Sequence, residues 1–372
     1  MGWINAQKSN HRTRIVLLKI LAATVAMGLL WPLGHRAIET ARSLVNRTPS
    51  LNYTVTVLRP PDGLSSSYSS GINNNGDVLI TASSTRPNSR LQSYVWQHGV
   101  FTLINSPGVK YMQATGLNDN GQVVGKATLP TREQRPFLWR DGKTIFLPTL
   151  GVERRGTFYL NEARSINNDG QVVGSVFAGD HIHFAGWDKS GKLTDGGASI
   201  KPGHSMAMGT NSKGQIVGYL MPDSGPQPFF LSSGGKCVLI NPLGHDNCDA
   251  FGINDKSEVV GSFQDTNLNT IAFIYHNGET TCLDSPNGTQ ASALAINNSS
   301  QVVGYLLTQG KYTAVLWING KMLDLNSLIP PGSGWKLREA SAINDHGQIV
   351  GDGDLFGKPC AFLLTPTTPN RR

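Results

Sequence analysis

The sequence predicts an all-β protein, a seven-bladed β-propeller of four-stranded antiparallel blades preceded by one N-terminal hydrophobic helix. The first observation is a repeat: a string of the type "GLNDNGQVVG" (116–125) occurs seven times, at spacings of 43 to 49 residues. The second is that each unit resolves into four strand-like runs joined by turn signals. Repeats of this length with four strands each are typical of propeller blades.

A hydrophobic segment precedes the repeats. Basic residues at its start, Lys8, Arg12 and Arg14, come before an apolar run at 15–33, which would be about 28 Å long as a helix. This pattern is typical of an export signal or membrane anchor, which we assign to residues 1–34, with a linker at 35–50. A cut after Ala37 would place His35 where a small residue is preferred, so an uncleaved anchor is favoured over a cleaved signal peptide. The propeller at 51–369 is then expected outside the cytoplasm.

The positive charge lies at the two ends of the chain. Of the formal net charge of +7, residues 1–50 contribute +6 and the basic tail at 370–372 contributes +2, which leaves the body at −1. A body without a basic surplus lacks the electrostatic footprint of a nucleic-acid-binding protein. We therefore expect no nucleic-acid partner, and a membrane contact only through the N-terminal helix.

One asparagine marks the first-to-second-strand turn of every unit: Asn73, Asn118, Asn167, Asn211, Asn254, Asn297 and Asn344. Its side chain can bond its own backbone two residues on, and the glycine that follows accepts a left-handed conformation. Ser257 and Ser300 replace that glycine in two units, so those turns are expected to be slightly strained or differently built. The turns lack the dense carboxylates of calcium loops, so no metal and no cofactor is predicted.

Two further positions repeat. A small residue stands on the first strand of each unit, which predicts crowding near the propeller axis: Ser69, Ala114, Ala163, Ala207, Ala250, Ala293 and Ala340. A bulky residue stands on the third strand, where the gaps between blades widen and large rings can fill them: Trp96, Trp139, Trp187, Leu231, Tyr275, Trp317 and Leu364.

The ring is expected to close through a strand from the other end of the chain. The last unit has no fourth strand, while the run "YTVTVL" at 53–58 precedes the first unit without a partner. We predict that it completes the last blade, because closure removes the free sheet edges that promote aggregation. The closed propeller is then expected to be monomeric.

The segment "SLIPPGSGWKLREASAINDHGQIVGDGDLFGKPCAFLLTP", with the repeated "GIN-x-x-GQVVG" and "AFLW"-like segments, resembles the HAF-repeat proteins, a bacterial group regarded as extracellular. The resemblance covers about residues 51–368, and the chain departs from it by showing the repeat's histidine only at His183. It implies export, to a bacterial cell membrane or beyond, and a repeat fold. It supplies no catalytic residues.

The long loops are expected to share one end of the propeller, because second-to-third-strand loops and blade-to-blade connections lie together, opposite the tight turns. Loops on a rigid scaffold concentrate binding residues. The candidate contact residues of this end are Tyr111, Arg132, Arg135, Arg154, Arg155, Tyr159, His204, Trp335, Lys336 and Arg338.

The sequence gives only weak indications of a metal site, a catalytic acid pair or disulfides. His181 and His183 lie two residues apart, but further ligands with matching spacing are missing, so a paired surface or packed histidine is favoured over a metal site. Glu162 and Glu339 precede the small residue in two blades that are not adjacent, which favours loop-capping carboxylates over a shared catalytic pair. The four cysteines are expected to be mostly unpaired: Cys237, Cys248, Cys282 and Cys360.

Two functions remain open. The favoured one is a non-enzymatic binding or scaffold module for a saccharide, peptide or protein, acting through the loop end. The alternative is a propeller hydrolase or lyase acting on a saccharide or peptide. An acidic pair at the loop-end mouth would favour the enzyme, and a mouth with aromatic residues and no titratable cluster would favour binding.

Overall fold

The computed structural model describes residues 51–367, apart from 60–63, 65, 84–90, 152–160, 200–202, 223–224, 246 and 287–288. The expected N-terminal helix at 1–34, the linker at 35–50 and the tail at 370–372 lie outside the described residues. Within the described part of the chain, none of the helices has the length and apolar character that a membrane span needs.

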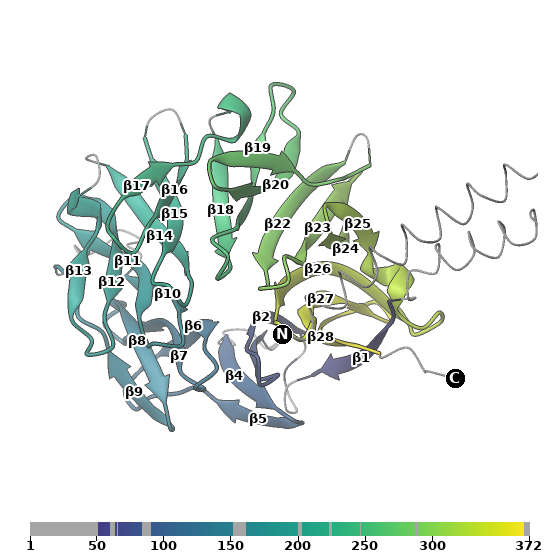
Figure 1. Cartoon of the computed structure of the whole chain (residues 1–372). Coiled ribbons are helices and arrows are strands. Elements are labelled where there is room, and N and C mark those ends of the chain that lie inside the picture. Colours follow the sequence, from purple (N-terminus) through teal and green to yellow (C-terminus); the bar gives the residue numbers. More distant parts are fainter. Residues whose placement is uncertain are drawn as a thin grey trace, which may run out of the picture. The chain divides into compact units, whose positions relative to one another are not determined.

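Residues 52–367 form seven separate four-stranded antiparallel sheets, as predicted. Figure 1 shows these sheets arranged as blades around a common centre, with the first strand of a blade nearest the centre and the fourth at the rim, as for β6 and β9. The repeat length and turn chemistry therefore led to the correct architecture.

The first three blades consist of β2 (Ser66–Ile72), β3 (Val78–Ser83), β4 (Gln92–Gln97) and β5 (Val100–Leu103); β6 (Tyr111–Leu117), β7 (Val123–Thr128), β8 (Gln134–Arg140) and β9 (Lys143–Phe146); and β10 (Glu162–Ile166), β11 (Val172–Ala178), β12 (His181–Trp187) and β13 (Leu193–Asp195). The next three consist of β14 (His204–Thr210), β15 (Ile216–Met221), β16 (Gln227–Leu231) and β17 (Cys237–Leu239); β18 (Cys248–Ile253), β19 (Val259–Gln264), β20 (Thr270–His276) and β21 (Glu279–Cys282); and β22 (Gln290–Ile296), β23 (Val302–Thr308), β24 (Lys311–Ile318) and β25 (Lys321–Asp324). Three short 3-10 helices follow fourth strands: η1 (Gly197–Ser199), η2 (Pro242–Gly244) and η3 (Leu325–Leu328).

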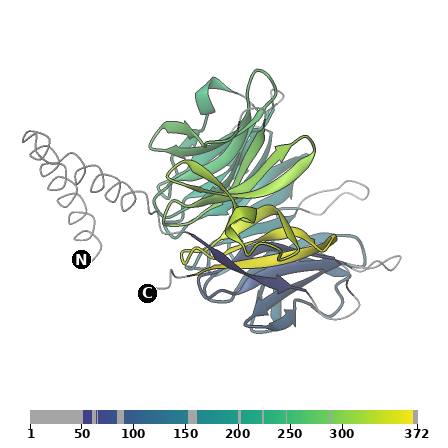
Figure 2. The same ribbon diagram turned by 90° about the vertical axis from the view of Figure 1, so that its right-hand side faces the viewer.

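The seventh blade joins the two ends of the propeller. It consists of β26 (Trp335–Ile343), β27 (Ile349–Leu355) and β28 (Lys358–Pro366), completed by β1 (Tyr53–Leu58). The purple strand β1 lies beside the yellow strands of this blade in Figure 2, and its register with β28 runs from Tyr53 opposite Pro366 to Leu58 opposite Ala361. Because both Tyr53 and Leu58 are fully buried, the predicted seam is part of the core.

The small residues of the first strands sit where the backbones approach most closely. Ala114 lies opposite Gly125 of the neighbouring strand, and a Cβ added to Gly125 would stand 2.0 Å from the carbonyl oxygen of Gln113. Directly after Ala114 the register shifts by one residue, and all seven blades show such a bulge near this point. Crowding was therefore predicted correctly, whereas the bulge was not anticipated.

The bulky residue of each third strand packs against the preceding blade. Trp187 is fully buried against Val124 and Leu147 of the second blade, and its indole nitrogen donates to the carbonyl oxygen of Pro148 at 2.9 Å. Trp317 makes the equivalent bond to Asp284 at 2.7 Å. A buried aliphatic residue directly after the fourth strand packs into the same layers, as with Ile104, Leu147, Ile240 and Leu283. An inter-blade layer is thus filled from both sides.

The two turns that carry serine keep the common geometry. Ser257 and Ser300 adopt φ values of 66° and 60°, in the left-handed region where the other turns place glycine. Their hydroxyl groups donate to the preceding blade, Ser257 to Gln215 and Ser300 to Glu258. The expected strain is therefore present and is offset by an inter-blade hydrogen bond.

Candidate functional site

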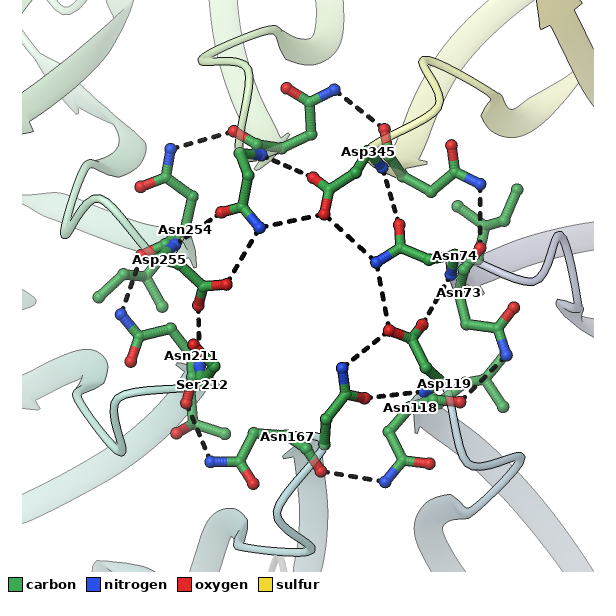
Figure 3. A pocket seen from close by; sticks show the side chains of 18 of the residues that line it. Asn73, Asn74, Asn118, Asp119, Asn167, Asn211, Ser212, Asn254, Asp255 and Asp345 are labelled. Atoms are coloured by element: carbon green, nitrogen blue, oxygen red, sulfur yellow. Dashed lines mark hydrogen bonds between the residues drawn. The ribbon is translucent and has the colours of Figure 1, made fainter. Parts of the chain in front are cut away.

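The propeller presents two different ends. We call the end with the first-to-second-strand turns the turn end, and the end with the long loops and blade-to-blade connections the loop end. At the turn end, the amide nitrogen of each repeat asparagine donates to the main-chain carbonyl of the next repeat asparagine, at 2.9 to 3.0 Å, through all seven blades and from Asn344 back to Asn73. We call this closed set the asparagine ring (Figure 3).

Each member of the asparagine ring also holds its own turn. The side-chain oxygen of Asn118 accepts from the main-chain nitrogens of Asn120 and Gln122, and its amide donates to the Gln122 side chain. The seven side chains are buried, at 3 to 6% exposure. The local turn bond was therefore predicted correctly, whereas the bond from blade to blade was missed.

A second layer at the turn end combines amides and carboxylates with one serine. It contains Asn74, Asp119, Asn168, Ser212, Asp255, Asn298 and Asp345. The carboxylate of Asp119 accepts from the amides of Asn74 and Asn168, and that of Asp345 accepts from Asn74 and Asn298. Figure 3 shows these side chains around an open centre, and the cavity there has a volume of about 230 Å³.

Hydrogen bonds lower the pKa of one of these carboxylates, Asp255. Burial raises the pKa of Asp255, but hydrogen bonds from Ser212 and Asn298 outweigh it, so that the pKa lies below its usual value. Across the described residues, no three His, Cys, Asp or Glu side chains come together in a way that could hold a metal ion. At the turn end, the blades are thus joined by the neutral amides of the asparagine ring and by carboxylates that accept hydrogen bonds from neighbouring amides.

The loop end of the channel carries charges that differ from blade to blade. Glu162 opens β10 with only 1% of its side chain exposed, and its carboxylate accepts from Lys126 at 3.1 Å and from Arg164. Lys126 comes from β7 of the second blade, so this group links two neighbouring blades. A buried carboxylate between two cations is the arrangement that desolvation requires.

A second group lies in the seventh blade. Glu339 on β26 stands opposite Asp352 on β27, and Arg338 binds Asp352 at 3.2 Å and Asp354 at 3.6 Å. Burial and the nearby charge of Asp352 raise the pKa of Glu339 to about 7, although Arg338 opposes the shift. Burial also raises the pKa of Asp352, despite its bond to Arg338. The loop end therefore holds an acidic pair.

Tyrosines and a further acid lie among these charges. Burial raises the pKa of Tyr219 on β15, and the charges of Arg164, Asp249 and Glu162 also act on this hydroxyl, which places residues of the third, fourth and fifth blades near one another. Burial raises the pKa of Asp249 as well. On the sixth blade, the rings of Tyr305 and Tyr312 meet edge to face at 5.2 Å.

The candidate contact residues from the sequence have different surroundings. Arg338 belongs to the acidic group just described, and Trp335 is half-buried with its ring edge to face against Phe362 at 5.9 Å. His204 accepts from the main-chain nitrogen of Ile182. Arg135 pairs with Glu133, and Tyr111 is half-buried at the start of β6. Arg132 and Lys336 are exposed. The remaining three candidates lie outside the described residues: Arg154, Arg155 and Tyr159.

The histidine pair and the glutamates also have defined partners. His183 bonds Asp195 at 2.9 Å, and the ring of His181 meets that of His204 at 5.3 Å. Glu162 and Glu339 belong to separate groups, each with partners in its own or the adjacent blade. Lys126 and Asp352 were not predicted from the sequence, although each directly follows the glycine of a "VVG"-type second strand. Lys126 faces Gln113 across the ladder, and Asp352 faces Glu339. The four cysteines all lie in the described part of the chain, and none of them forms a disulfide there.

Comparisons with known proteins support the architecture. No protein-family model and no curated protein sequence matches the chain. Among solved structures, the β-propeller domain of the trilobed protease from Pyrococcus furiosus has a TM-score of 0.55 at 11% identity, covering 82% of this chain and 99% of that one. A streptogramin B lyase has a TM-score of 0.53 at 13% identity (85% and 98%). Oligogalacturonate lyase from Vibrio parahaemolyticus has 0.54 at 11% (85% and 97%). At these identities the likeness shows the propeller fold alone.

Proposed function

We propose that this protein is an exported, non-enzymatic binding propeller that holds a saccharide or peptide chain at the loop end of its channel. The observation that carries the proposal is the gathering of paired charges and tyrosines there. Lys126, Glu162 and Arg164 form one group, and Arg338 with its two aspartates forms another. At the turn end, by contrast, the asparagine ring is the same in every blade, and the second layer varies only among Asn, Asp and Ser.

The chemistry of these groups suits a ligand rich in hydroxyl or amide groups. Arginine offers directional donors, the carboxylates accept, and tyrosine rings supply flat apolar area next to a polar group. Because Glu162 is almost fully buried and already held by two cations, its group is rigid before a ligand arrives. Preorganised groups lose little entropy on binding.

Glycan and peptide arrays, followed by calorimetry on each hit, test this proposal. Arg164→Gln and Arg338→Gln should each weaken the ligand at least about tenfold, which corresponds to about 1.4 kcal/mol. The exposed turn-end residue His346, changed to Ala, serves as the control and should leave affinity unchanged. A ligand whose affinity responds to the turn-end change and not to the loop-end changes would refute the placement.

The acidic pair of the seventh blade is the feature expected above for an enzyme, and it favours a second candidate, acid and base catalysis on the same ligand class. Glu339, with a pKa of about 7, is suited to exchange a proton near neutral pH. Two of the similar solved structures are lyases, although the fold by itself does not decide activity. Glu339→Gln should then abolish turnover of a bound ligand and preserve its binding. Unchanged ligand after long incubation with the wild-type protein would count against catalysis.

Export is part of the proposal and has its own test. The apolar run at 15–33 and the near-neutral body favour a propeller outside the cytoplasm. Alkaline phosphatase fused after Arg372 should be active in a bacterial host, because this reporter needs an oxidising compartment to form its disulfides. An inactive fusion, together with an active cytoplasmic reporter at the same position, would reverse the assignment.

A further inference from the structure

The interface between the third and fourth blades differs from the other inter-blade layers. It contains a cavity of about 660 Å³, which we call the 3/4 cavity. Its lining includes turn residues of both blades, such as Lys189 and Lys213, so it lies toward the turn end. Cavities of roughly 300 to 1,000 Å³ are the usual size of small-molecule sites.

The first cause is a missing ring. The bulky third-strand residue packs against the preceding blade, and four blades place tryptophan there: Trp96, Trp139, Trp187 and Trp317. The fourth blade has Leu231 at this position, and it packs against Phe184 of the third blade. Leucine leaves unfilled the volume that an indole occupies elsewhere, and Leu231 lines the cavity.

The second cause lies on the other side of the same layer. Gly196 follows the fourth strand of the third blade and donates to the main-chain carbonyl of Phe184, as Ile104, Leu147, Ile240 and Leu283 donate at their equivalent positions. Those aliphatic side chains are buried between blades, and Gly196 has none. Both fillers are therefore absent from this one interface.

Phe184 takes up part of the vacated space and forms an aromatic wall. A Cβ on Gly196 would stand 1.9 Å from the Phe184 ring, so the ring occupies the place of the missing aliphatic group. It packs on Phe229 of the fourth blade at 5.1 Å. The cavity persists beside this ring, between Phe184 and Leu231, whereas the indole of Trp187 lies in the layer toward the second blade.

The acidic and the basic side chains that line the cavity differ in how far other groups of the protein engage them. Asp188 accepts from the main-chain nitrogens of Ser190 and Lys192, and Asp195 holds His183. By contrast, within the described parts of the chain, Lys189 and Lys213 form no ion pair. Asp188 and Asp195 are thus engaged, whereas the third acid of the lining, Asp169, is exposed like the two lysines. The exposed charged groups of the lining are then two ammonium groups and one carboxylate, which leaves a positive surplus to meet a ligand.

We propose that the 3/4 cavity is a binding site for a small aromatic acid. The flat ring would lie between Phe184 and Leu231, and the acidic group would face Lys189 and Lys213. This site is separate from the loop-end ligand of the proposed function, so either proposal can fail without the other.

Two fluorescent probes test the proposal in the full-length protein: 1-anilinonaphthalene-8-sulfonate and its uncharged analogue N-phenyl-1-naphthylamine. We expect saturable one-to-one binding of both. Leu231→Trp should reduce the affinity of both at least tenfold, because the indole fills the cavity and can donate to the carbonyl oxygen of Gly197, as Trp187 does to Pro148. The double variant Lys189→Gln and Lys213→Gln should weaken the sulfonate at least fivefold and leave the uncharged probe unchanged.

The thiol of Cys237 provides an independent readout in the wild-type protein, which does not depend on whether the Leu231→Trp variant folds. Cys237 is exposed and lines the 3/4 cavity, while Cys282 is exposed on the fifth blade and does not. The sulfonate probe should slow alkylation of Cys237 by N-ethylmaleimide at least fivefold and leave Cys282 unaffected. Equal protection of both thiols, or no protection of Cys237 at saturating probe, would overturn the proposal. Probe binding that stays the same in the Leu231→Trp variant would overturn the proposal as well.

Discussion

The turn end and the loop end of the channel are built from the same strands and differ in how the blades relate to one another. At the turn end every blade contributes the same asparagine, and the seven form one closed hydrogen-bonded ring. At the loop end the equivalent positions hold different residues, among them Gln113, Glu162, Met206, Asp249 and Glu339.

The turn end therefore serves to close the propeller, whereas the loop end can differ from blade to blade. A ring that joins identical groups loses strength if one blade varies, so variation is costly there. Among the described residues, the loop end shows no closing contact of this kind, and its ion pairs lie within a blade or between two neighbours. Change can therefore accumulate at the loop end while the scaffold stays rigid, which is the usual division between framework and functional loops.

The largest expected effect comes from opening the seam. Deleting residues 51–59 removes the buried Tyr53 and Leu58 and leaves β28 with a free edge. The melting temperature of the full chain should fall on the order of 5 to 10 °C, with new oligomers in size-exclusion chromatography. Val57→Ser, on the exposed side of the same strand, should change neither measurement. A monomer with unchanged melting would mean that β1 is not needed for closure.

A single side chain tests closure at the asparagine ring. Asn344→Ala removes the bond to Asn73 and leaves main-chain donors of its own turn unsatisfied in a buried place. The free energy of unfolding should fall by roughly 2 to 4 kcal/mol in a urea titration. His346→Ala, two residues on, should change it by less than about 0.5 kcal/mol. Similar values for the two variants would show that the ring contributes no stability.

The loop end should make stability depend on pH. Glu339 titrates at about 7 in the folded protein against an ordinary value of 4.5, so the folded state holds more protons between these pH values. Its contribution is fully present below pH 4.5 and is lost as the pH rises through about 7, a decrease of roughly 1 to 3 kcal/mol. Denaturant titrations from pH 4.5 to 8 measure it. Glu339→Gln should flatten this slope, and an equally steep slope in the variant would contradict the assignment.

The smallest effect concerns the turns with serine. Ser300→Gly relieves a left-handed backbone and loses the bond to Glu258, so the free energy of unfolding should stay within about 0.5 kcal/mol of the wild type. Ser300→Ala keeps the strain and loses the same bond, and should cost about 1 kcal/mol. If both variants were equally stable, the hydroxyl would not be offsetting the strain.

The fold was predictable because its signals are local and repeated. The asparagine and glycine of each turn, the small residues at the axis and the strand at 53–58 each led to a feature that the structure contains. The asparagine ring was not predictable in the same way, because its acceptors lie 43 to 49 residues away or, for Asn344, at the other end of the propeller.

The charged groups of the loop end were predictable only in part. Glu162 and Glu339 could be singled out from their position before the small residue. Lys126 becomes part of a charged group only through Glu162 of the next blade, and Asp352 only through Glu339 on the neighbouring strand. The 3/4 cavity shows the same limit. Leu231 was visible as an exception to the aromatic stripe, yet its consequence depends on Gly196 on the facing side of the layer.

The asparagine ring runs head to tail, each member donating to the next, and it therefore has no first and no last member. The asparagine ring does not depend on which blade comes first along the chain. A gene rearranged so that new termini fall between two other blades, with the old ends linked, would leave all seven bonds available. Only the seam between β1 and β28 would change from a join between chain ends into an ordinary hairpin. This protein is thus suited to circular permutation.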